Sequence, residues 1–389
     1  MDIFSQVVQP SQIDVPSNAV ADPIFQTSVY AFHSVKQVDA ILTGLETGYT
    51  YTRGKNPNVE ALGQLMARLE GAEGAVVTAS GTASVLAALL ALSPEPASIY
   101  LAREIYGGTV GLCRRVLEPL GYRVQWVDGH DPGACDAVFA NGPGVLVVES
   151  LSNPLGRVSP LDTLIPTAHA RGIKVLVDNT FATPFHVTPF KWGADVVVHS
   201  ATKFIGGHSD VVLGVIVGSE QITHAAQDIV DMAGFTPDPF AAWLALRGAR
   251  TLALRMERQS DNAFKLARAL ETCSAISAVY YPGLPSHPDY EIAQKLFVRG
   301  FGAIVSMRLR QGFDAVERMV QRLQWVRMVP SLGDVTTTVS HPVVASHREL
   351  SREERAWVGI DEGVVRISVG IESIEDIIAD FRQALEAIS

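Results

Sequence analysis

Covalent amine chemistry is the first possibility that the sequence raises, because one lysine stands in an unusual setting. Only seven of the 31 basic residues are lysines, so few positions could supply a reactive amine. Lys203 comes just after an apolar run, with hydroxyl side chains at Ser200 and Thr202. Burial at the end of a strand lowers the pKa of a lysine, and the neutral amine is a nucleophile. We therefore expect Lys203 to react with a carbonyl group, against the alternative of a solvated surface lysine.

A carboxylate stands in an equivalent place at the end of an earlier apolar run. The run 174–178 ends in Asp178, which is followed by Asn-Thr-Phe. An aspartate here could cap a helix, or it could stay ionised beside a buried cation. Pyridoxal phosphate requires an amine for its aldehyde and an anion for its pyridine nitrogen. The pair of Lys203 and Asp178 therefore predicts a site for pyridoxal 5'-phosphate.

The phosphate of such a cofactor needs donors, and three segments could provide them. The segment 79–84 opens an apolar helix with small residues, and a helix N-terminus binds anions through free N–H groups. The hydroxyls near Lys203 and the phenol and guanidinium of segment 51–53 could add further bonds. Alone, each feature is more often a helix cap or a solvated arginine. We expect the cofactor to contact Ser80, Gly81, Thr82, Ser200, Thr202, Tyr51 and Arg53.

Three more residues could complete the site. Tyr106 follows another strand end and could stack on a flat ring, with an ordinary turn as the alternative. Asn153 follows the next strand end and could form a hydrogen bond with a ring substituent, again with a turn as the alternative. Arg366 lies in an otherwise apolar strand, where a buried guanidinium needs a partner. We expect that partner to be a substrate carboxylate, with a structural salt bridge as the alternative.

The hydrophobic pattern predicts the scaffold that must position these residues. Short Val/Ile/Leu runs alternate with amphipathic stretches, which is typical of a parallel sheet with helices on both faces. Ligands of such sheets bind beyond the carboxyl ends of the strands. Strands are expected at 98–101, 124–127, 145–149, 174–178, 195–199 and 211–217, and helices at 59–69, 80–92, 109–120 and 161–171.

The rest of the chain predicts two further parts. Residues 1–50, with prolines at 10, 16 and 23, are expected to form an extended arm with at most one short helix. A long helical stretch at 239–270 precedes strand-like runs at 277–281, 302–309 and 364–369 and a closing helix at 374–388. We therefore expect an arm (1–50), a large cofactor-binding domain (51–240) and a small C-terminal α+β domain (241–389).

Composition limits the classes of partner. The net charge of -10, without a long run of like charges, gives no support to nucleic acid or an anionic membrane as a partner. The three cysteines lack the spacing of a zinc site, so we expect no metal and a reducing cytoplasm. We expect neither a signal peptide nor a membrane span, because no apolar run approaches the ~20 residues that cross a bilayer. No G-x-G-x-x-G motif follows the first strand, which gives no support to a dinucleotide site.

Together the ordered motifs resemble one family, the pyridoxal-phosphate enzymes of cysteine and methionine metabolism, the cystathionine γ-synthase-like group of fold type I. The resemblance covers nearly the whole chain. It implies an α/β fold with a mostly parallel seven-stranded sheet between helices, a smaller C-terminal α+β domain and an N-terminal arm. The segments that carry it are 23–28, 51–57, 106–109, 152–154, 178–180, 200–203, 281–287, 331–334 and 366–370.

The resemblance also implies roles for the residues. Lys203 would hold the cofactor as a Schiff base, Asp178 would pair with the pyridine nitrogen, and Tyr106 would stack on the ring and assist proton transfer. The phosphate would be held by Gly81, Thr82, Ser200 and Thr202, with Tyr51 and Arg53 reaching in from a neighbouring subunit. The substrate carboxylate would be bound by Asn153, Ser331 and Arg366. A homotetramer built from two dimers with shared sites is implied.

The implied reaction is cleavage of a carbon–sulfur bond by α,γ-elimination on a small sulfur-containing or homoserine-derived amino acid. Four alternatives stay open: γ-replacement on an O-acylated homoserine, a β-lyase, an aminotransferase, and a noncatalytic cofactor-binding protein. Thr50 and Thr336 stand where cystathionine-handling members commonly carry acidic residues. Gly108 stands where typical methionine γ-lyases have a cysteine, whereas the segment 331–334 is similar to both the methionine γ-lyase and the homoserine-ester sulfhydrylase branches.

Overall fold

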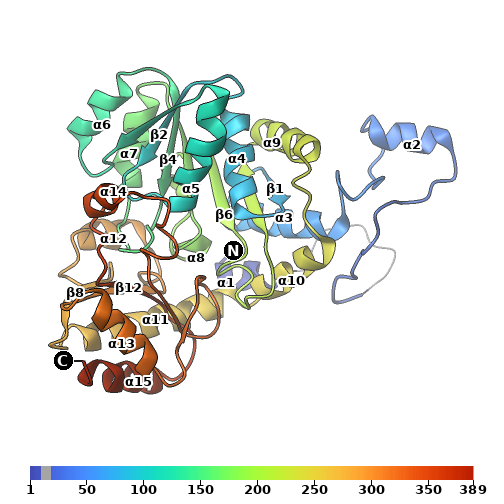
Figure 1. Cartoon of the computed structure of the whole chain (residues 1–389). Coiled ribbons are helices and arrows are strands. Elements are labelled where there is room, and N and C mark those ends of the chain that lie inside the picture. The colour runs from blue at the N-terminus through green and yellow to red at the C-terminus, as the bar shows by residue number, and fades with distance from the viewer. Residues whose placement is uncertain (10–18, 389) are drawn as a thin grey trace.

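Two β-sheets organise the chain, and Figure 1 shows the larger one above the smaller one. In this computed structural model, residues 1–9 and 19–388 are described; residues 10–18 of the predicted arm, with its first two prolines, and residue 389 lie outside that description. The larger sheet has the strand order β1-β7-β6-β5-β4-β2-β3. Its strands are β1 (Gly74–Thr78), β2 (Ser98–Ala102), β3 (Arg123–Val127), β4 (Gly144–Glu149), β5 (Lys174–Asp178), β6 (Val196–Ser200) and β7 (Gly214–Gly218).

The larger sheet is mostly parallel, as the sequence predicts. Only β7 runs antiparallel to its neighbours β1 and β6. The other adjacent strands are parallel, so β2, β4, β5 and β6 all end at the same edge. The helices around it are α3 (Pro57–Glu70), α4 (Gly81–Leu92), α5 (Gly107–Leu112), α6 (Pro132–Phe139), α7 (Leu161–His169), α8 (Thr183–His186), α9 (Glu220–Ala233) and α10 (Pro239–Ala249).

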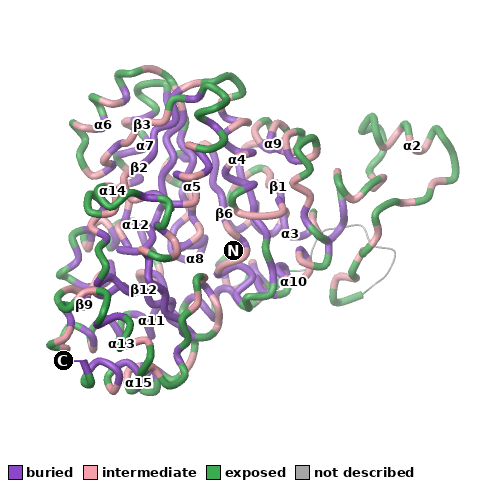
Figure 2. Tube along the Cα trace, in the orientation of Figure 1, coloured by how far each residue is buried: buried purple, intermediate pink, exposed green. Residues whose placement is uncertain are grey.

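Both faces of the larger sheet are buried, which explains the nearly continuous apolar strands. Leu146 and Val148 of β4 belong to the core that includes α3 and α7. Val145 and Val147 of the same strand belong to the core that includes α4 and α9. Side chains that alternate between two dry cores leave no polar face on the strand. Figure 2 accordingly shows buried strands inside a shell of partly exposed helices.

The smaller sheet has the strand order β10-β11-β12-β9-β8. It packs with α11 and α15 around a core of its own. Its strands are β8 (Ile276–Tyr280), β9 (Ile304–Leu309), β10 (Arg327–Met328), β11 (Thr338–Ser340) and β12 (Val364–Ser368). Its helices are α11 (Leu252–Leu270), α12 (Tyr290–Leu296), α13 (Phe313–Arg322), α14 (Arg352–Trp357) and α15 (Ile374–Glu386).

The N-terminal segment contains two short helices, so the expectation of at most one was wrong. They are α1 (Ile3–Gln6) and α2 (Val35–Leu42). The α1 helix buries Ile3 against the body, whereas α2 has no buried residue and projects away from it (Figure 1). Ser34 caps α2 by accepting a hydrogen bond from the N–H of Gln37. Local capping thus produces a helix that the proline-rich composition did not suggest.

Two further expectations needed correction. The stretch 239–270 is two helices, α10 and α11, separated at Arg250 and Thr251. The expected strand 211–217 begins only at Gly214, because Leu213 forms backbone hydrogen bonds with the Thr202 side chain. Among the described residues, we find no helix with the length and apolar character that crossing a membrane requires.

Candidate active site

A cavity of about 360 Å³ lies beyond the carboxyl ends of β4, β5 and β6. This volume falls in the usual range for small-ligand sites, roughly 300–1,000 Å³. The larger sheet supplies one wall, and segments of the smaller sheet supply the other. The structure brings together at this cavity all the predicted site residues except Tyr51 and Arg53: Ser80, Gly81, Thr82, Tyr106, Asn153, Asp178, Ser200, Thr202, Lys203, Ser331 and Arg366.

Lys203 lies in the turn that follows β6. Its N–H donates to the carbonyl of Ser200 at 3.1 Å, and its Nζ donates to Ser331 Oγ at 2.9 Å. Burial, and secondarily the nearby charge of Arg366, lower the pKa of Lys203 from 10.5 to about 8. About a tenth of the amine is therefore neutral at pH 7 and can act as a nucleophile or a base.

The backbone around Lys203 is held from two sides. Arg255 of α11 donates to the carbonyls of Phe204 at 2.7 Å and Ile205 at 3.2 Å. Gly333 has a φ of +84°, and a Cβ there would lie 2.6 Å from the Phe204 nitrogen. Only glycine permits this close approach of the 331–334 loop. Sequence reasoning missed Arg255, because its partners are carbonyl groups that no side-chain pattern reveals.

The N-terminus of α4 forms one end of the cavity. The Ser80 hydroxyl accepts from the N–H of Ala83 at 3.2 Å, and the remaining N–H groups of a first helical turn have no partner within the helix. A Cβ on Gly81 would lie 2.8 Å from Ser200 Cβ, so the two segments meet closely. Thr202 also lines the cavity, and its hydroxyl donates to the Leu213 carbonyl. The backbone donors of α4 and the Ser200 hydroxyl fit an anionic group.

Asp178 forms the floor of the cavity at the end of β5. One carboxylate oxygen accepts from the N–H of Thr180 at 3.0 Å. Burial raises the pKa of this carboxyl group, and no described lysine or arginine forms an ion pair with it. A buried carboxylate without such a counter-cation fits the protonated ring nitrogen of pyridoxal phosphate.

Arg366 of β12 lies on the wall of the cavity that the smaller sheet supplies. It donates to Asn153 Oδ1 at 3.1 Å and to the Ser331 carbonyl at 2.8 Å. Its Nε is buried without a partner among the described residues. Burial lowers the pKa of this guanidinium to about 10, yet it stays charged at neutral pH. A buried cation that contacts only neutral groups fits the carboxylate of an amino acid.

Tyr106 lies on the cavity wall at the start of α5, and 39% of it is exposed. Its N–H donates to Glu149 Oε1 at 2.9 Å. Burial, followed by the charge of Glu149, raises the pKa of the Tyr106 phenol, so the phenol keeps its proton at neutral pH. The sequence predicts Glu149 as the last residue of a strand (145–149) but indicates no role for the glutamate.

Tyr51 and Arg53 lie outside this cavity. Both are exposed, and the Arg53 guanidinium sits 5.6 Å from the centre of the Tyr51 ring. Arg53 also donates to the backbone carbonyl of Asp231 at 2.8 Å. The two side chains are thus presented at the surface rather than toward Lys203 of the same chain.

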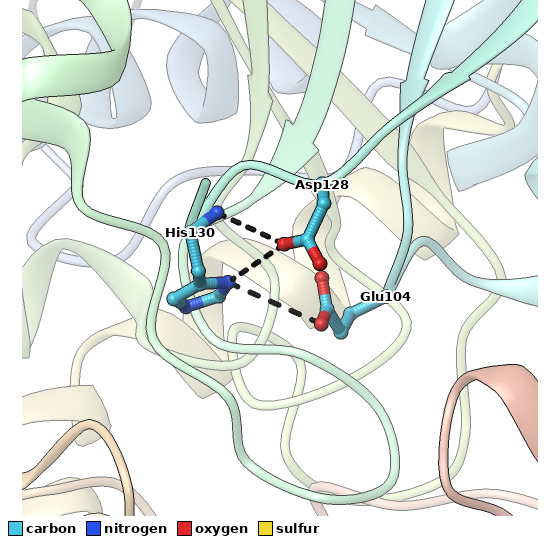
Figure 3. A group of neighbouring side chains, drawn as sticks. All are labelled: Glu104, Asp128 and His130. Atoms are coloured by element: carbon cyan, nitrogen blue, oxygen red, sulfur yellow. Dashed lines mark hydrogen bonds and ion pairs between the residues drawn. The ribbon is translucent and has the colours of Figure 1, made fainter. Parts of the chain in front are cut away.

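A cluster of charged residues lies next to the segment that carries Asn153, and Figure 3 shows its centre. The carboxylates of Glu104 and Asp128 lie 4.0 Å and 3.8 Å from His130 Nδ1. Two arginines offset these acids: Arg103 pairs with Asp128 at 2.8 Å, and Arg157 lies 3.5 Å from Glu104. The cluster is therefore an ion-pair network that anchors Arg157, next to the loop that carries Asn153.

Known proteins with similar sequences belong to the family that the site residues predict. The family model described as "Cys/Met metabolism PLP-dependent enzyme" matches residues 5–386. The O-succinylhomoserine sulfhydrylase of Pseudomonas aeruginosa is 38% identical over 98% of this chain and 94% of that relative. The L-methionine gamma-lyase of Porphyromonas gingivalis is 35% identical over 99% of this chain and 97% of its own length.

A solved structure is similar over the whole chain. The cystathionine gamma synthase of Xanthomonas oryzae pv. oryzae, in complex with aminoacrylate and cysteine, superposes with a TM-score of 0.94 and is 34% identical. The match covers 100% of this chain and 98% of that one. The predicted fold class and the predicted family resemblance are therefore confirmed.

Proposed function

Since the chain belongs to the Cys/Met metabolism PLP-dependent enzyme family and is a pyridoxal-phosphate enzyme of sulfur amino-acid metabolism, we propose that it cleaves a γ-carbon–sulfur bond by α,γ-elimination. The proposed substrate is a methionine-like amino acid. With methionine and one water, the products are methanethiol, ammonia and 2-oxobutanoate.

The cavity residues bind the cofactor in this proposal. When bound, pyridoxal phosphate supplies an aldehyde for amine exchange and a ring that accepts electrons. Lys203 provides the amine, and Asp178 accepts a hydrogen bond from the ring nitrogen and keeps it protonated. The N–H groups of α4 and the Ser200 hydroxyl bind the phosphate. Tyr106 covers one face of the ring.

The same cavity orients the substrate and moves its protons. Arg366, held by Asn153, binds the substrate carboxylate. Lys203 Nζ then accepts the proton of Cα, and Ser331 Oγ keeps that nitrogen in place through the bond of 2.9 Å. The protonated phenol of Tyr106 donates to the departing sulfur.

The charged side chains on the cavity wall favour methionine over cystathionine as the substrate. Its charged side chains are Glu149, Asp178, Lys203 and Arg366. Three of them have roles at the cofactor and the substrate carboxylate, and both Glu149 oxygens accept from backbone N–H groups. Among the described residues on the cavity wall, no acid is left to pair with the distal ammonium of cystathionine. An uncharged γ-substituent is therefore favoured.

A second candidate is γ-replacement, in which a thiol or sulfide attacks the γ-carbon. The observation that favours it is the 38% identity with a relative named O-succinylhomoserine sulfhydrylase. The two reactions share every step up to the loss of the γ-substituent and differ in the nucleophile that follows.

We also propose a homotetramer whose subunits share sites. Tyr51 and Arg53 are exposed and do not line the cavity of their own chain, which suits a contribution to the cofactor phosphate of a neighbour. We also propose a cytoplasmic location, which the three free cysteines fit.

A product assay tests the proposal. Purified protein with added cofactor is given methionine, cystathionine, cysteine or O-succinylhomoserine, with and without sulfide. We expect 2-oxobutanoate and a thiol from methionine. Pyruvate from cystathionine without turnover of methionine would identify a β-lyase instead, and amino transfer to a 2-oxo acid would identify an aminotransferase.

A further inference from the structure

We propose that Glu149 is a positioning residue whose carboxylate sets the placement of Tyr106 relative to Asn153. The inference rests on the proposed function, in which Tyr106 serves the leaving group and Asn153 serves the substrate carboxylate. Glu149 would thus fix the distance between the two ends of the substrate site.

The contacts of Glu149 are the first argument. Its Oε1 accepts from the N–H of Tyr106 at 2.9 Å, and its Oε2 accepts from the N–H of Asn153 at 3.1 Å. The residue is buried, with 7% exposure, at the last position of β4. One rigid carboxylate at a strand end therefore joins two loops that come from different strands.

The way each loop is built gives the second argument. Tyr106 stands at the N-cap of α5, where its carbonyl accepts from Thr109 and no side chain caps the helix. Asn153 is fixed at its side chain by Arg366 at 3.1 Å. Glu149 accepts from the backbone N–H groups of both Tyr106 and Asn153. Removing its carboxylate therefore leaves both N–H groups without this partner and loosens both loops.

The position of the Tyr106 ring adds a third argument. A Cβ on Gly108 would lie 2.3 Å from the ring, so the ring folds back over the start of α5. That arrangement depends on the backbone angle at Tyr106, which the bond to Glu149 helps to hold.

Ionisation of Glu149 is unfavourable in its surroundings. In the parallel pairing of β4 with β5, Glu149 is the register partner of Asp178, another acid. Burial and the charge of Asp178 raise its pKa well above the ordinary value. The backbone N–H groups of Tyr106 and Asn153 offset part of this cost by donating to the carboxylate.

Three substitutions separate the roles of the carboxylate. Glu149→Gln keeps the length but offers one acceptor, so its amide N–H₂ faces an N–H donor. Glu149→Asp keeps two acceptors on a side chain that is one methylene shorter. Glu149→Ala leaves both N–H groups without a partner. The matched control is Asp380→Asn, because Asp380 is another buried acid whose carboxylate accepts from backbone N–H groups, but it does not line the cavity.

Two measurements on the cofactor-loaded proteins test the proposal. The first is the dissociation constant of norleucine, which resembles methionine but has no leaving group. The second is the circular dichroism of the bound cofactor, which reports the asymmetry of the groups stacked on its ring. For Glu149→Gln we expect unchanged thermal stability within a few degrees, a dissociation constant at least ~10-fold higher and an altered cofactor signal. Glu149→Asp should fall between Gln and wild type.

Several results would overturn the proposal. Glu149→Gln with wild-type norleucine binding and cofactor signal would show that the carboxylate positions neither residue. An equal effect of Asp380→Asn would show a general response to the loss of a buried carboxylate. Failure of all three Glu149 variants to fold would assign Glu149 a purely structural role. If the wild type binds norleucine but does not turn over methionine, the proposed reaction fails while the positioning of Glu149 is still tested.

Discussion

The pKa of Lys203 makes a quantitative prediction about how fast the protein captures its cofactor. Burial and Arg366 lower this pKa from 10.5 to about 8. At pH 7 a pKa of 8 leaves about 9% of the amine neutral, against ~0.03% for an unshifted lysine, a difference of roughly 300-fold in the reactive form. Because only the neutral amine attacks the aldehyde, the capture rate should rise with pH and level off above the pKa.

The assay mixes cofactor-free protein with excess pyridoxal phosphate from pH 6 to pH 10 and follows the visible absorbance in a stopped-flow instrument. We expect a midpoint near pH 8 in the rate profile. Arg366→Gln removes the smaller of the two causes, so its midpoint should move upward but stay below 10.5. Arg308→Gln, on the neighbouring strand β9 and outside the cavity, is the control and should leave the midpoint unchanged. A wild-type midpoint at 10 or above, or a rate that does not change with pH, would refute the reasoning.

Three further predictions concern the cofactor site. Asp178→Ala should fold normally but lose roughly 100-fold or more in turnover, because the ring nitrogen loses its buried partner; near-native turnover would count against the assignment. Gly81→Ala should weaken cofactor binding by about 10-fold, since its Cβ would lie 2.8 Å from Ser200 Cβ, and an unchanged dissociation constant in a cofactor titration would contradict this. Mixed Arg53→Ala and Lys203→Ala subunits should regain activity if the site is shared, whereas no recovery after proven subunit exchange would argue for separate sites.

The strands of the larger sheet could be predicted because each one is a short run of apolar residues in the sequence. The runs at 145–149 and 174–178 agree with β4 and β5 almost residue by residue, since the middle of a strand buried on both faces consists of apolar residues. The strand Thr338–Ser340 was missed, because three residues of mixed polarity carry no periodic pattern. The proposed limits of the two domains, at residue 240, remain a prediction.

The sequence predicted some residues of the site and missed others, for a different reason. Lys203, Asp178 and Arg366 could be proposed because reactive or charged groups in apolar surroundings are unusual in any sequence. The role of Glu149 could not, because it depends on which backbone N–H groups approach the end of β4. The hydroxyl of Thr202 looked available in the sequence, whereas the Leu213 carbonyl accepts its proton in the fold.

The identity of the reactive lysine is the central claim, and one measurement tests it most directly. Protein loaded with cofactor is reduced with borohydride, digested, and examined by mass spectrometry for a peptide that carries a pyridoxyl group. Lys203 is one of only seven lysines, so each candidate peptide can be distinguished. The account predicts the group on Lys203 and its loss in Lys203→Ala. A pyridoxyl group on another lysine of the active wild-type protein would contradict it.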